Sequence, residues 1–140
     1  MALKMDAGAL HAFLKSDFPQ VNDMFTVEEV AEMSVRVRCH VADAHLRPGG
    51  TVSGPTMFAL ADVSVYLAIL AMIGPQALAV TTNCSMDFMR KPVAGRDLIA
   101  DCRLLKLGRV LAVGDVLIRS EGGDAVVARA SMTYSIPPAR

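Results

Sequence analysis

Asp62 is the one charged residue in an apolar segment that runs from Pro55 to Ile73. A carboxylate in apolar surroundings is costly unless it is paired or hydrogen-bonded. Of the side chains three and four positions away along a helix, only that of Tyr66 carries a polar atom. Two interpretations follow. Asp62 is either a structural group that binds loop backbone inside the core, or a general base or nucleophile.

The start of the same segment could also do chemistry. Pro55 suits the first turn of a helix, and Gly54 comes just before it. The loop GGTVSGP would therefore present backbone N–H groups at the positive end of a helix dipole. Such groups can stabilise a developing oxyanion. This signal has low specificity on its own, because every helix has an N-terminus.

A helix that is apolar on every side is either enclosed by protein or lies in a membrane. Nineteen residues is near the lower limit for a membrane span. An Asp near the helix centre would oppose insertion into a membrane by roughly 2.5–3.5 kcal/mol. No basic residue directly follows the segment, since the next residues are Gly74 and Pro75. We expect no membrane span, and instead a sheet of the same protein that wraps this helix.

The remaining segments supply such a sheet. We expect an amphipathic helix over 6–16, strands near 25–42, and further strands over about 77–90, 97–108, 110–121 and onward to 136. Short turns join the later strands, which favours antiparallel neighbours. The prediction is one α+β domain over 1–140, with five or six antiparallel strands around one apolar helix.

Composition excludes several classes of protein. Fourteen basic residues balance fourteen acidic ones, so there is no electrostatic footprint for nucleic acid. The three cysteines form no CxxC pair and the three histidines lack metal-ligand spacing, so we expect no metal. The N-terminal residues lack the apolar run of a signal peptide. These features predict a cytoplasmic protein with reduced thiols.

The sequence Leu-Ala-Asp at 60–62, with Asp62 eight residues after Gly54, resembles the hot-dog-fold thioesterases, in particular the PaaI-like (phenylacetyl-CoA) group. That group has a loop ending in His-Gly-Gly, and an Asp eight residues after the first of those glycines. The similarity extends over roughly 24–137, including TTNCSMDFMRKPVAGRDLIADCRLLKLGRVLAVGDVLI. It implies a hot-dog fold and hydrolysis of an acyl-CoA thioester, with a small or medium acyl or aryl group.

The resemblance also implies roles for individual residues. The Gly54 N–H would polarise the thioester carbonyl, and Asp62 would activate a water or attack directly. Thr81 stands where the family often has a Ser or Thr that holds the attacking water. Ser53 occupies the family's His position and can donate one hydrogen bond, but cannot act as an imidazole. Arg47 occupies a position that is Asn in some members, and would add a cation beside the carbonyl or the CoA phosphates.

Four further cations could bind the phosphates of CoA: Arg90, Lys91, Lys106 and Arg109. The alternative is that they are solvated charges at turns. CoA would enter as part of the substrate, so no metal or redox cofactor is expected.

Geometry requires a second chain for this chemistry. Eight residues of helix rise about 12 Å, so Asp62 cannot reach a carbonyl held at Gly54 of the same chain. The resemblance likewise implies a dimer with sites at its interface. We therefore expect a homodimer or a dimer of dimers.

Two alternatives stay open. A hydratase or dehydratase of the same fold would usually pair a carboxylate with a His, and neither position 53 nor the apolar helix provides one. A stand-alone module that binds acyl-CoA without turnover would share the fold and the ligand.

Overall fold

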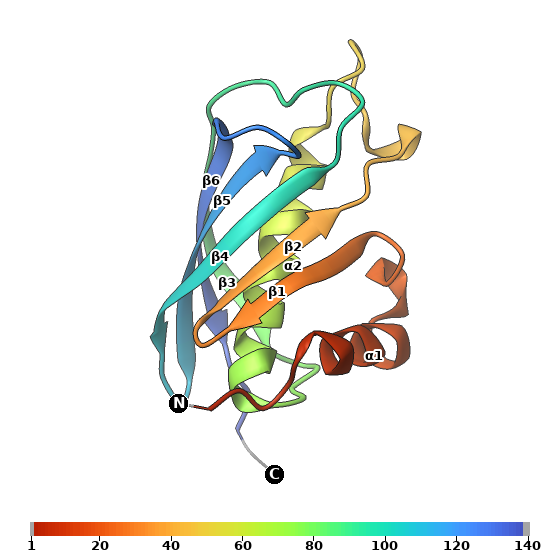
Figure 1. Ribbon diagram of the computed structural model, residues 1–140. Helices are drawn as coiled ribbons and strands as arrows, with labels where there is room; N and C mark the ends of the chain where they lie inside the picture. Colours follow the sequence, from red (N-terminus) through yellow and green to blue (C-terminus); the bar gives the residue numbers. More distant parts are fainter. Residues whose placement is uncertain (1, 139–140) are drawn as a thin grey trace.

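A computed structural model describes residues 2–138 and consists of one sheet, one central helix and one peripheral helix (Figure 1). The helices are α1 (Ala7–Asp17) and α2 (Gly54–Ile73), with short 3-10 turns at η1 (Pro19–Val21) and η2 (Asp43–His45). The strands are β1 (Phe25–Ala31), β2 (Ser34–Cys39), β3 (Val80–Phe88), β4 (Leu98–Leu107), β5 (Leu111–Ser120) and β6 (Val126–Ser135).

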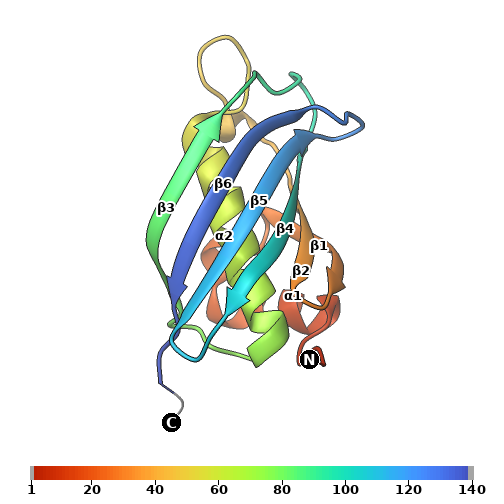
Figure 2. The same cartoon turned by 90° about the vertical axis from the view of Figure 1, so that its left-hand side faces the viewer.

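All six strands form one antiparallel sheet in the order β1-β2-β4-β5-β6-β3. The sheet curves around α2, which crosses its inner face, while α1 lies beside β1 at one end (Figures 1 and 2). Strand β3 is at one edge and pairs only with β6 in the described chain. This arrangement is the hot-dog fold, as the sequence predicted.

Helix α2 is the centre of the core, but its two halves differ. Every side chain from Val63 to Met72 is buried, as expected for a helix with no polar face. The first half keeps one open stripe, formed by Pro55, Phe58, Ala59 and Asp62 at helical spacing. Phe58 is 40% exposed. By length and composition α2 could cross a membrane, but 78% of its most apolar window is buried within the protein.

Local sequence sets the ends of α2. Ser53 is the N-cap, with its Oγ 3.4 Å from the N–H of Thr56 and 2.8 Å from the Thr56 hydroxyl. Gly54 is therefore the first helical residue, next to the cap. The helix stops at Gly74, whose φ of 90° is accessible to glycine at low cost and whose N–H binds the Leu70 carbonyl.

A glycine in the sheet sets how closely α2 can approach it. A Cβ at Gly114 of β5 would lie 3.1 Å and 3.2 Å from the two γ-methyl groups of Val65. The missing side chain therefore lets the middle of α2 pack directly on the strand.

Candidate active site

Three elements converge on the carboxylate of Asp62. Helix α2 places Asp62 at the end of its open stripe, facing the inner sides of β3 and β6. Its Oδ1 accepts hydrogen bonds from the hydroxyl of Thr81 on β3 and, at 2.7 Å, from that of Tyr134 on β6. Thr81 and Tyr134 are directly opposite each other in the β3–β6 pairing. The sheet register therefore delivers both hydroxyls to one oxygen.

Tyr134 is fixed as a hydrogen-bond donor. It is 3% exposed, and burial together with the negative charge of Asp62 raises the pKa of its phenol. The hydroxyl also lies 2.9 Å from the main-chain oxygen of Asp62. A phenol in this setting stays protonated at neutral pH, so its proton remains directed at Asp62.

The contacts of Asp62 do not match the structural interpretation. In residues 2–138, its carboxylate binds two side-chain hydroxyls and no main-chain N–H. Tyr66, the one polar neighbour by helical spacing, instead donates to the carbonyl of Ala77 at 3.1 Å. Burial raises the pKa of Tyr66 to about 12, with a smaller contribution from Asp17. Asp62 is thus held by hydroxyls and remains partly open to solvent.

A small cavity of about 230 Å³ opens beside Asp62. It is lined by aromatic and small apolar side chains together with the polar groups of Asp62, Tyr66, Thr81 and Tyr134. The rings of Phe18 and Tyr66 meet edge to face with centroids 5.9 Å apart. A carboxylate at the rim of such a cavity can act on a bound molecule and on water.

A second cavity, of about 320 Å³, lies at the N-terminal end of α2. It brings Gly54 together with three of the predicted phosphate-binding cations, Arg47, Arg90 and Lys91. The ring of Phe88 lies against Gly54, 3.4 Å from where a Cβ would be. This end of the molecule therefore combines helix N–H groups with positive charge, as an anionic ligand requires.

The other two predicted cations lie elsewhere. Lys106 and Arg109 are at the β4–β5 connection, at the opposite end of α2 from Gly54 (Figure 2). Arg109 borders a separate cavity with Ile73, the last residue of that helix, and Gln76, which follows the helix. One chain therefore does not gather all five cations around one ligand.

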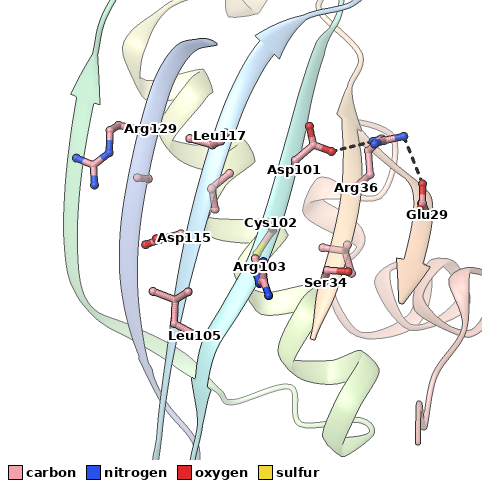
Figure 3. A pocket seen from close by; sticks show the side chains of 13 residues that line it. Glu29, Ser34, Arg36, Asp101, Cys102, Arg103, Leu105, Asp115, Leu117 and Arg129 are labelled. Carbon is pink, nitrogen blue, oxygen red and sulfur yellow. Dashed lines mark hydrogen bonds and ion pairs between the residues drawn. The ribbon is translucent and has the colours of Figure 1, made fainter. Parts of the chain in front are cut away.

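A further hollow, of about 430 Å³, lies on the outer face of the sheet (Figure 3). Several of its charged groups form ion pairs. Arg36 contacts Asp101 at 2.8 Å and Glu29 at 3.3 Å, and Arg129 contacts Asp87 at 2.6 Å. This face is separated from Asp62 by the sheet, so it is not part of the candidate site.

Within residues 2–138, no group of three or more His, Cys, Asp or Glu side chains is placed to hold a metal ion. His11 accepts a hydrogen bond from the Val27 N–H at 2.8 Å, and His40 contacts the Thr26 hydroxyl at 2.6 Å. The histidines with these contacts serve the packing of the first strands.

Tyr134 was not among the predicted site residues. The signal for it is in the last strand, where Ala128, Ala130 and Met132 share a face with Tyr134. A single hydroxyl at the end of an otherwise apolar inward face needs a buried partner. That partner is Asp62.

The sequence model of the thioesterase superfamily matches residues 49–127, and the chain belongs to this superfamily. The chain is similar to a candidate thioesterase from Silicibacter sp. TM1040, with 59% identity and a TM-score of 0.92 over 99% of this chain and 96% of that one. It also resembles a mutant of the phenylacetic acid degradation protein PaaI from Thermus thermophilus, with 31% identity and a TM-score of 0.73 over 85% and 99%. A third similar structure is a protein of Streptococcus mutans UA159 bound to acetyl CoA, with 26% identity and a TM-score of 0.72 over 83% and 90%.

Proposed function

We propose that this protein hydrolyses the thioester bond of acyl-CoA, with Asp62 as the reacting carboxylate. The observation that carries the proposal is the convergence of Thr81 and Tyr134 on Asp62 at the rim of a small cavity. Membership of the thioesterase superfamily supports the same reaction.

Asp62 can act in two ways. As a general base it takes a proton from water, whose oxygen attacks the carbonyl carbon; the tetrahedral intermediate then collapses and CoA leaves as a thiol after protonation. As a nucleophile it attacks the carbonyl carbon, the C–S bond breaks and CoA leaves as the thiolate, and water then hydrolyses the acyl anhydride to the free acid and Asp62. Because Thr81 donates its own proton to Asp62, its oxygen keeps lone pairs that can accept a hydrogen bond from the attacking water. The Gly54 N–H would stabilise the carbonyl oxygen as it gains charge.

We further propose that two copies of the chain complete each site. The open stripe of α2 includes the exposed Phe58. Strand β3, whose outer edge has no partner strand in residues 2–138, exposes Val80 (57%) and Phe88 (54%). An exposed strand edge next to exposed apolar side chains favours pairing with another copy. In the dimer, Gly54 of one chain would face Asp62 of the other. Sedimentation of an active monomer at assay concentration would contradict this arrangement.

CoA is the expected leaving group. The relative from Streptococcus mutans is bound to acetyl CoA, and Arg47, Arg90 and Lys91 offer charges for CoA phosphates next to Gly54. The small cavity beside Asp62 favours a small or medium acyl or aryl group. We propose that the reaction uses no metal or redox cofactor, since a carboxylate and a helix N-terminus suffice for it, and that it acts on cytoplasmic acyl-CoA.

The test is a panel of aryl-, short-, medium- and long-chain acyl-CoAs, with release of the free thiol followed by a thiol-reactive dye. Hydrolysis of at least one member supports the proposal. Tight binding of acyl-CoA with no thiol release from any of them would instead indicate a binding module. If an enoyl-CoA is added to the panel, loss of its enoyl absorbance without thiol release would indicate a hydratase.

A further inference from the structure

We propose that Tyr134 is a positioning residue that sets which oxygen of Asp62 reacts. It holds Oδ1 in a hydrogen-bonded state and leaves Oδ2 as the oxygen that acts on water or the thioester. This inference rests on the proposed function, because it concerns the same carboxylate.

The hydrogen bonds of Asp62 are asymmetric. The hydroxyls of both Thr81 and Tyr134 donate to Oδ1, and within residues 2–138 no donor does so to Oδ2. Two donors on one oxygen draw its electron density into hydrogen bonds, so the other oxygen is the more available base. The more basic oxygen is thus selected before any substrate binds.

Tyr134 contacts both the side chain and the main chain of Asp62, unlike Thr81. Its single proton lies between the carboxylate Oδ1 at 2.7 Å and the main-chain oxygen of the same residue at 2.9 Å. The phenol therefore ties the side chain of Asp62 to its own backbone and restricts rotation of the carboxylate. A reacting group held in one orientation loses less entropy on reaching the transition state.

The phenol is itself held rigidly. Tyr134 is 3% exposed, and its ring lies 6.3 Å from that of Tyr66. Across the strands it pairs with Thr81, so the sheet holds the two donors opposite each other. Because burial raises the pKa of the phenol, Tyr134 remains a donor at neutral pH.

The test compares Tyr134→Phe with Ser64→Ala. Each change removes one buried hydroxyl, but the Ser64 hydroxyl donates to the Leu60 carbonyl at 2.7 Å and not to Asp62. We expect Tyr134→Phe to lower kcat by roughly 10- to 100-fold, with KM changed about twofold or less. We expect Ser64→Ala to keep kcat and KM close to wild type.

A spectroscopic readout is independent of turnover. Tyr66 and Tyr134 are the two tyrosines of the chain, so Tyr66→Phe protein labelled with 3-fluorotyrosine has one ¹⁹F signal, that of position 134. The chemical shift of this signal should change when Asp62→Asn is added, because the hydroxyl then donates to a neutral amide oxygen in place of a carboxylate. The readout also decides the question if Tyr134→Phe does not fold.

The outcomes separate the two proposals. No hydrolysis by the wild type would overturn the proposed function, while the ¹⁹F comparison would still test the link between Tyr134 and Asp62. An active wild type, together with full kcat in folded Tyr134→Phe, would overturn the positioning role alone. A ¹⁹F signal unaffected by Asp62→Asn would also overturn it.

Discussion

Replacement of Asp62 by Asn removes the charge and little else. The amide oxygen can still accept from the hydroxyls of Thr81 and Tyr134, which both bind Oδ1. The new NH₂ group takes the place of Oδ2, where no described donor would oppose it. The variant should therefore fold, and its packing should be unchanged.

The expected effects differ in size for stability and for rate. Each of the two hydrogen bonds changes from charged to neutral, which weakens it by about 1 kcal/mol. Relief of the partly buried charge opposes this, so we expect a shift of only a few degrees in Tm. Loss of a general base lowers kcat by about 10²–10⁴-fold, equivalent to roughly 3–5 kcal/mol in the barrier. The change in rate should therefore exceed the change in stability.

Thermal unfolding and acyl-CoA hydrolysis should be measured on one preparation of each variant. Asp87→Asn is the control, because Asp87 is a carboxylate on β3 that pairs with Arg129 on the outer face of the sheet. We expect the control to keep wild-type kcat. If Asp62→Asn keeps full activity per folded molecule, or if it unfolds the protein while the rate of the folded fraction is unchanged, Asp62 is a structural residue and the mechanism is wrong.

Two further predictions concern the fold. Gly114→Ala should lower the free energy of unfolding by about 1–3 kcal/mol, because its Cβ would lie within 3.2 Å of both methyl groups of buried Val65. Urea unfolding measures this, and Val65→Ala should partly restore stability in the double variant; a fully stable Gly114→Ala would refute the close packing. For Asp97, burial raises the pKa, but hydrogen bonds from the Val41 N–H and from Arg38 outweigh it and hold the pKa below the ordinary 3.8. Its stabilising contribution is therefore present above that value and lost as pH falls below it. Thermal melts from about pH 6 to about pH 2 should show a shallower acid decline for Asp97→Asn, and parallel curves would contradict this.

The parts of the fold that depend on local pattern could be predicted from sequence. The continuous apolar run identified α2, and the short turns after residue 90 identified antiparallel neighbours. The position of β3 could not be derived in this way, because it pairs with β6, which follows two intervening strands. That pairing is a long-range consequence of how the sheet closes over α2.

The same distinction holds for the site. Asp62 was identifiable as a charge in an apolar helix. Thr81, 19 residues away, was identified as a site residue through the resemblance to a family. Tyr134 is 72 residues from Asp62, and only the three-dimensional register shows that its hydroxyl reaches the carboxylate. Similarly, the sequence suggested Lys106, Arg109 and Arg90 as phosphate-binding residues. The fold places Arg90 near the N-terminal end of α2, whereas Lys106 and Arg109 lie at its opposite end.

The most direct test of the account is a crystal structure of the wild-type protein with an acyl-CoA analogue in which a methylene group replaces the thioester sulfur. The account predicts a dimer in which the analogue's carbonyl oxygen accepts a hydrogen bond from Gly54 N–H of one chain. Asp62 of the other chain should lie beside the carbonyl carbon, with Oδ2 the nearer oxygen. An analogue bound away from Asp62, or contacted by Gly54 and Asp62 of one and the same chain, would contradict it.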